Sequence, residues 1–152
     1  MFHYLYYMRK YHQGKYTMRN PEKYVGDVNN IIYRSSWELK FLKWADMNPS
    51  VLFISSEEVI IPYYSQVDLK MHRYFVDFAL MIQKKDGTIK KYLVEIKPEA
   101  QTLPPKKGKR STTKHLNEMA TYSVNQSKWK AADEFCRKNG LEFIVLTEKH
   151  LF

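Results

Sequence analysis

The first clear pattern along the chain is a helical one within residues 35–46. Trp37, Phe41 and Trp44 recur at i, i+4 and i+7, the spacing of one apolar face of an α-helix. Asn48-Pro49 follows directly, and the residue before a proline avoids the helical conformation. The pattern therefore predicts an amphipathic helix that ends before Pro49.

Strand-like runs follow this helix. Residues 51–54 and 59–64 are rich in β-branched and aromatic side chains, and a stronger pair of runs spans 73–83 and 89–97. Asp86-Gly87 stands between the two stronger runs, which is typical of a hairpin turn. We therefore expect the stronger runs to form an antiparallel hairpin.

The last third of the chain predicts a loop, a helix and a strand. Residues 99–112 hold prolines and lysines in place of any periodic pattern, which favours a mobile loop. A helical pattern starts near Thr112 and stops at Gly140. The pattern is compatible with a break in this helix near Asn125. Residues 141–146 read as a closing strand.

The predicted order is helix, three strands, helix, strand. An antiparallel hairpin followed by a crossover helix implies one mixed four-stranded sheet flanked by helices, an α/β (α+β) fold. Residues 31–152 would form this domain. Residues 1–30 predict an irregular, basic, Tyr-rich arm that packs on the domain, although its rings would also suit stacking on bases.

Composition narrows the class of protein. The 152 residues, 44% of them hydrophobic, suit one domain with its own core. A net charge of +9 favours a polyanionic partner, nucleic acid first. The single cysteine, Cys136, excludes a disulfide scaffold and a cysteine zinc cage. Apolar runs are far shorter than a bilayer crossing needs, so we expect a soluble, uncleaved chain without a membrane partner.

Side-chain alternation along the hairpin brings three ionisable residues together. Glu95 and Lys97 share one face of their strand. Asp77 points away from the face that holds the apolar side chains of its own strand, which are Tyr74, Val76, Phe78 and Leu80. Adjacent strands would thus hold Asp77, Glu95 and Lys97 in one cluster, on the side opposite their most apolar residues.

This cluster suits phosphodiester hydrolysis. Two neighbouring carboxylates repel each other unless a cation lies between them. Mg²⁺ takes oxygen ligands and keeps waters and phosphate oxygens in its shell, and Mn²⁺ would substitute. An ammonium group beside that ion can orient the attacking water. We expect no small-molecule cofactor.

The residues resemble the PD-(D/E)xK nuclease superfamily over roughly residues 31 to 147. The pattern stands here as Val76-Asp77 and then Glu95-Ile96-Lys97, with Val76 in place of the usual proline. The resemblance implies a restriction-endonuclease-like αβββαβ core. It implies that Glu38, Asp77, Glu95 and Lys97 are catalytic, and that Asp77, Glu95, Glu38 and the carbonyl of Ile96 bind the metal.

Two further segments carry the resemblance. The segment from Arg34 to Glu38 looks like the helix-borne glutamate of TnsA-like endonucleases, and the basic arm is similar to that of the head-completion nucleases of T-even-type tailed phages. This likeness implies action on double-stranded DNA, in joining heads to tails. It also implies phage head or neck proteins as partners, and a place in the cytoplasm of the infected host cell and in the virion. We expect little sequence specificity, because the sequence shows no recognition helix or aromatic base platform with a known signature.

Glu38 has a second interpretation. Ser35-x-x-Glu38 is a capping box, in which Glu38 would bond back to the backbone of Ser35. Glu38 also lies on the same side of the predicted helix as Leu42, so we expect its carboxylate to be partly buried and to need a partner. Glu57 and Glu58 are rival metal ligands at the start of a strand. The histidines lack the arrangement that an HNH nuclease needs.

Basic residues near the cluster predict contacts with DNA. The loop and the start of the next helix contain no acidic residue between positions 106 and 114, which favours non-specific phosphate contacts. The predicted nucleic-acid-binding residues are Arg34, Lys106, Lys107, Lys109, Arg110, Lys114 and Lys128. Two other functions stay open: a non-catalytic DNA-binding neck protein, and a repair or transposon-type endonuclease.

Overall fold

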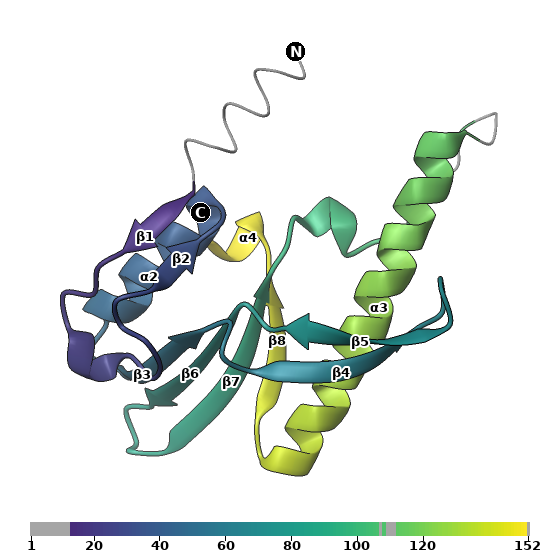
Figure 1. The fold of residues 1–152 in the computed structure, drawn as a ribbon. Coiled ribbons are helices and arrows are strands. Elements are labelled where there is room, and N and C mark those ends of the chain that lie inside the picture. The colour runs from purple at the N-terminus through teal and green to yellow at the C-terminus, as the bar shows by residue number, and fades with distance from the viewer. Residues whose placement is uncertain (1–12, 107, 109–111, 152) are drawn as a thin grey trace.

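The computed structural model describes residues 13–106, 108 and 112–151. The elements, in order, are β1 Gly14–Tyr16, the 3-10 helix η1 Pro21–Lys23, β2 Ile31–Tyr33, α2 Ser36–Met47, β3 Val51–Ser56, β4 Ile60–Ser65, β5 Lys70–Phe75, β6 Phe78–Gln83, β7 Ile89–Ile96, the 3-10 helix η2 Glu99–Gln101, α3 Thr113–Asn139, β8 Glu142–Leu146 and α4 Glu148–Leu151. The described part of the chain begins with two short strands and helix α2, continues through strands β3 to β7, and ends with helix α3, strand β8 and the short helix α4 (Figure 1).

A four-stranded sheet carries the domain, in the order β3-β6-β7-β8. Its first three strands are antiparallel neighbours, and β8 joins β7 in parallel after the crossover helix α3. The expected mixed sheet flanked by helices is confirmed, as is the hairpin at Asp86-Gly87. The short helix α4 was not predicted. Among the described residues, every helix is too short or too polar to cross a lipid bilayer.

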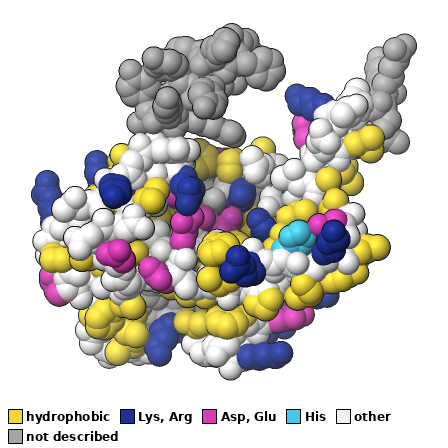
Figure 2. Space-filling view, viewed as in Figure 1, with side chains coloured by type: hydrophobic (Ala, Val, Ile, Leu, Met, Phe, Trp, Pro, Cys, Tyr) yellow, Lys and Arg dark blue, Asp and Glu magenta, His cyan; other side chains and the backbone are white. Residues whose placement is uncertain are grey.

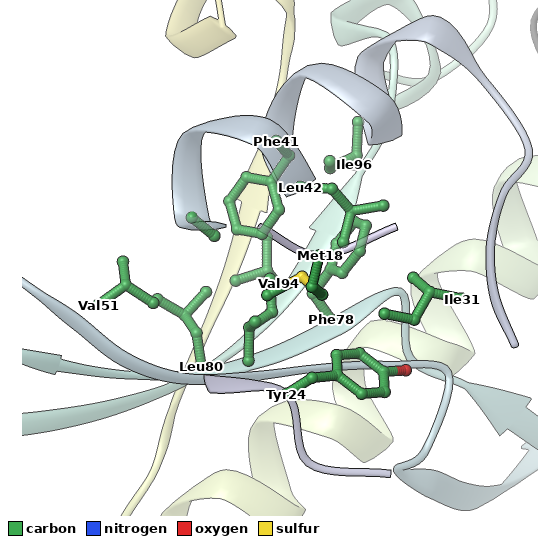
Figure 3. Packing of buried hydrophobic residues seen from close by; sticks show 12 residues of the cluster. Met18, Tyr24, Ile31, Phe41, Leu42, Val51, Phe78, Leu80, Val94 and Ile96 are labelled. Atoms are coloured by element: carbon green, nitrogen blue, oxygen red, sulfur yellow. The ribbon is translucent and has the colours of Figure 1, made fainter. Parts of the chain in front are cut away.

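Two apolar cores lie on opposite faces of the sheet. On one face, Phe41 and Leu42 of α2 pack against Phe78, Leu80 and Val94 (Figure 3). The rings of Phe41 and Phe78 have centroids 4.7 Å apart. On the other face, α3 buries its own small side chains against the sheet and β4, at Ala132 and Cys136. Burial of each large apolar side chain contributes roughly 1.5–3 kcal/mol, so both helices are held firmly against the strands.

Both helices differ in detail from the prediction. In α2 the buried positions are Phe41, Leu42, Ala45 and Asp46, whereas Trp44 is 45% exposed. The apolar face is therefore rotated away from the predicted one. Helix α3 runs without a break through Asn125 for 27 residues and ends at Gly140, whose φ of 69° suits a residue without Cβ.

The described part of the arm packs on the domain, as predicted, but the prediction of an irregular arm is wrong, because β1 pairs with β2 and η1 follows β1. Asp46, fully buried at the end of α2, accepts hydrogen bonds from the hydroxyl of Tyr16 at 2.6 Å and from the backbone of Arg19 at 2.8 Å and Asn20 at 3.0 Å. Tyr24 is also buried. The predicted positions Tyr4, Tyr6, Tyr7 and Tyr11 lie outside the described residues.

Candidate active site

A break in the predicted strand 73–83 creates the site. β5 ends at Phe75 and β6 begins at Phe78, so Asp77 lies at a junction and the prediction of one continuous strand is wrong. β5 pairs with β4 in a hairpin of its own. Opposite the junction, β3 ends at Ser56 and β4 begins at Ile60, so residues 57–59 face the shorter stretch 76–77. This is the geometry of a β-bulge, which re-aims side chains beside active sites.

Backbone hydrogen bonds fix the junction. The N–H of Glu57 donates to the carbonyl of Asp77 at 3.1 Å, and the N–H of Val76 donates to the carbonyl of Val59 at 3.0 Å. Glu57 adopts a left-handed conformation with a φ of 55°, which costs a residue with a Cβ roughly 1–2 kcal/mol. The surrounding bonds therefore hold a strained residue next to Asp77.

The break also changes which residues share a face. Tyr74 and Val76 lie in the core under α3, whereas Phe78 and Leu80 lie in the core under α2. The prediction of one common face for these four residues is wrong, because the phase of the strand changes at Asp77. The face of Glu95 is also not free of apolar neighbours, since Leu93 on the same face belongs to the core under α3.

The strand residues of the predicted cluster do come together at the end of β7. The carboxylate of Asp77 accepts a 2.8 Å hydrogen bond from the N–H of Ile96. Glu95 is 6% exposed, and one of its carboxylate oxygens lies 3.5 Å from the ammonium of Lys97. The other accepts a 2.5 Å hydrogen bond from the hydroxyl of Tyr74. Asp77, Glu95 and Lys97 therefore form one polar group at the edge of the core.

Glu38 joins this group from the first turn of α2. The hydroxyl of Ser35 accepts a hydrogen bond from the N–H of Glu38, which confirms the N-cap. The carboxylate of Glu38 accepts a 2.7 Å hydrogen bond from the backbone N–H of Arg34 rather than from that of Ser35. The capping box is thus shifted by one residue. One oxygen of the Glu38 carboxylate is engaged in this bond.

Arg34 and Glu57 form an ion pair across the mouth of the site. The guanidinium of Arg34 donates to both carboxylate oxygens of Glu57, at 3.0 and 3.2 Å. The pair is partly exposed, so its own contribution to stability is small. Arg34 was predicted to contact DNA and Glu57 was a rival metal ligand; in the structure each is engaged with the other.

The carboxylates of the site influence one another electrostatically. Burial, helped by the negative charges of Glu95 and Glu38, raises the pKa of Asp77 to about 8, although the hydrogen bond from Ile96 acts to lower it. Burial likewise raises the pKa of Glu38, with Glu57 and Glu95 adding to the effect. The protein therefore concentrates negative charge that its own cations do not balance. Figure 2 shows acidic and basic side chains gathered in the middle of this face.

The donor set fits a hard divalent cation. Asp77 and Glu95 offer carboxylate oxygens, and the chemistry of oxygen donors with excess negative charge is that preferred by Mg²⁺ or Mn²⁺. In the described part of the chain, no three His, Cys, Asp or Glu side chains form a metal-binding group. The two carboxylates would therefore leave coordination positions for backbone, water and phosphate oxygens.

Tyr74 is a residue of the site that was not predicted from the sequence. It was placed on the apolar face, and its hydroxyl gave no periodic signal. The ammonium of Lys128 lies 5.5 Å from the centre of the Tyr74 ring and 5.8 Å from that of Tyr63. Tyr74 therefore lies between the predicted DNA-binding residue Lys128 and the carboxylate of Glu95 that its hydroxyl contacts. Lys106 and Lys114 are exposed. Lys107, Lys109 and Arg110 lie outside the described residues.

Comparison with known proteins agrees with this geometry. Residues 48–148 match the family model described as TnsA-like endonuclease N terminal. This span includes Asp77, Glu95 and Lys97 and leaves out Glu38. The chain belongs to this endonuclease family. The predicted nuclease with a restriction-endonuclease-like core is thereby confirmed, and such a fold implies a divalent metal and a DNA substrate.

A curated relative extends the likeness to the whole chain. The chain is 41% identical over 144 residues to a protein named head completion nuclease from Enterobacteria phage T4, covering 92% of this chain and 93% of the relative. The match therefore covers almost all of both proteins. The predicted resemblance to the phage head-completion nucleases is confirmed at the level of sequence.

Proposed function

We propose that this member of the TnsA-like endonuclease family is a Mg²⁺-dependent deoxyribonuclease, with Mn²⁺ as a substitute, that processes double-stranded DNA during phage head completion. The observation that carries the proposal is the meeting of Asp77 and Glu95 beside Lys97 at the end of β7. The name of the phage T4 relative supports the place in head completion.

In this mechanism the site residues share the work of holding the metal, orienting the water and stabilising charge. Asp77 and Glu95 would hold the metal together with the carbonyl of Ile96, whose N–H already faces Asp77. When bound, a divalent cation polarises the phosphate and lowers the pKa of a water. Lys97 orients that water and stabilises negative charge on the phosphate. Glu38 supports the water or a second ion from α2.

The charged surroundings would position the DNA backbone. Lys128 lies beside the site, and Lys114 begins the same helix. We assign non-specific phosphate contacts to Arg34, Lys106, Lys107, Lys109, Arg110, Lys114 and Lys128. Residues 31–152 would form the nuclease domain and residues 1–30 its arm. The basic segment 99–112 was predicted to be a loop, but it begins with the 3-10 helix η2. The partners would be head or neck proteins, met in the host cytoplasm and in the virion.

Cleavage of a linear duplex tests the proposal. Wild-type protein should degrade the duplex with Mg²⁺ or Mn²⁺ and fail to do so with EDTA. Glu95→Ala and Lys97→Ala should each lose cleavage by at least about 100-fold. Glu142→Ala and Lys90→Ala are matched controls, because this ion pair lies at the far end of β7 and is partly exposed; both should cut like wild type.

Three outcomes would count against the proposal. If the Glu95 and Lys97 variants cut as well as wild type, the assigned site is wrong. If wild type binds DNA without cutting it under any divalent metal, the protein is a non-catalytic neck protein. If sequencing of the product ends shows discrete sites, a repair or transposon-type endonuclease replaces the non-specific enzyme.

A further inference from the structure

An open cavity of about 1010 Å³ lies next to the segment that follows β7. One wall is the segment after β7, from Ala100 to Lys106, and the other is the N-terminal half of α3, from Lys114 to Asn125. In Figure 1 the segment after β7 rises next to this half of α3. The volume is at the upper end of the about 300–1,000 Å³ at which protein pockets enclose small ligands.

One wall starts beside a catalytic residue, and the other leads along α3 toward the site. The segment after β7 follows Lys97 directly, with η2 two residues on. On α3, the positions Lys114, Thr121 and Asn125 are spaced for one helix face that continues to Lys128. Lys128 contacts the ring of Tyr74. This face is about 21 Å long, from the rise of a helix per residue, and leads from the mouth of the cavity to the site.

The lining offers the three kinds of contact that a nucleotide needs. Leu103, Pro104 and Tyr122 supply apolar and aromatic surfaces for the faces of a base. Lys106 and Lys114 supply positive charge for phosphate, with Glu118 as the acidic residue among the lining side chains.

Asn125 supplies the polar contact at the floor of the cavity. It is 5% exposed, and its side-chain Nδ2 has no hydrogen-bond partner among the described residues. A buried amide without a partner is costly, and the edge of a base offers the acceptor that it lacks.

We propose that this cavity binds an unpaired nucleotide of the DNA strand next to the scissile phosphate. A base-paired nucleotide has its edge occupied by its partner and its faces by stacking, so it cannot use these contacts. The protein would therefore prefer DNA with a single-stranded tail or frayed end over a blunt duplex. The inference rests on the proposed function and specifies its substrate.

Binding in EDTA tests this inference apart from cleavage. Fluorescence anisotropy should show that a duplex with a single-stranded tail of about six nucleotides binds about tenfold more tightly than the same duplex with blunt ends. Tyr122→Leu and Asn125→Leu should abolish this preference while leaving blunt-duplex affinity within twofold. Tyr64→Leu, at an exposed position on β4, is the matched control and should keep the preference.

Folding of the variants is checked by thermal melting. Asn125→Leu removes an unpartnered buried amide and should melt at or above the wild-type temperature, so its loss of tail binding would not reflect unfolding. Equal affinity of wild type for tailed and blunt DNA overturns the inference, as does a retained preference in both variants. If Glu95→Ala loses cleavage while wild type shows no preference for tailed DNA, the proposed nuclease function is supported and only the nucleotide-binding site is refuted.

Discussion

The hydroxyl of Tyr74 donates a hydrogen bond to the buried carboxylate of Glu95. The two residues come from different sheets, since Tyr74 lies on β5 of the inserted hairpin and Glu95 on β7 of the central sheet. The hairpin therefore supports the site from outside the sheet. With the hydroxyl on one oxygen and Lys97 beside the other, the Glu95 carboxylate is held in one orientation.

Replacement of Tyr74 by phenylalanine should loosen this carboxylate without emptying the core. The ring stays, but a buried acceptor loses its donor, which costs about 1–3 kcal/mol. We expect Tyr74→Phe to weaken Mn²⁺ binding, measured by isothermal titration calorimetry, and to slow cleavage by about tenfold, with saturating metal restoring part of the rate. Tyr64→Phe, at an exposed position, should change neither. Unchanged metal affinity in Tyr74→Phe would contradict the positioning role.

The local part of this arrangement was predictable from the sequence and the non-local part was not. The β6–β7 hairpin follows from Asp86-Gly87, and its register alone places Asp77 near Glu95. The break at Asp77 depends on a bulge at residues 57–59 of the opposite segment. The pattern of side chains within 73–83 contains no information about that bulge. Trp44 was misplaced because two overlapping apolar stripes fit α2, and the packing of Phe41, Leu42 and Ala45 in the core under α2 decides between them.

Stability should fall with rising pH when metal is absent. Burial raises the pKa of Asp77 to about 8 in the folded protein, whereas a free carboxyl titrates near about 4. The folded state therefore binds more protons than the unfolded chain between these values, and its stability decreases as the pH rises through this window. The raised pKa of Glu38 acts in the same direction.

Thermal melting between pH 5 and pH 8, taken at about one-unit steps across that window, measures the effect. In EDTA, the melting temperature of the wild type should drop by several degrees, and Asp77→Asn should flatten the dependence because it removes the titrating group. Addition of Mg²⁺ or Mn²⁺ should raise the melting temperature of the wild type most at pH 8. A melting temperature that rises with pH in EDTA would refute this account.

Asp46 should matter for stability rather than for chemistry. It is fully buried and receives hydrogen bonds from Tyr16, Arg19 and Asn20 of the arm. Asp46→Asn places an amide donor against existing donors, which should cost about 2 kcal/mol and lower the melting temperature by about 4–8 °C. Glu22→Gln, an exposed change in η1, should have little effect. The cleavage rate of folded Asp46→Asn well below its melting temperature should match wild type.

The pKa of Asp46 gives this variant a pH signature. Burial raises that pKa, but the hydrogen bonds from Tyr16, Arg19 and Asn20 outweigh it and leave it lowered. The stability that ionised Asp46 contributes is therefore present above about pH 4, the value of a free carboxyl, and is lost as the pH falls through the lowered pKa. The difference in melting temperature between wild type and Asp46→Asn should accordingly shrink at low pH; a constant difference would show that packing alone is at work.

Salt dependence of DNA binding separates the residues that contact phosphate from the rest of the positive charge. Each phosphate contact changes the slope of log K against log salt by about 0.9 on duplex DNA. Lys114→Ala, at the mouth of the cavity, should therefore lower the slope by about one contact and weaken binding to all sequences alike. Lys138→Ala, in the last turn of α3, removes the same charge at the other end of the helix, away from the residues that line the cavity, and should leave the slope unchanged. Equal slopes for the two variants would mean that the net charge of +9 acts as a diffuse attraction, and that Lys114 makes no contact with a phosphate.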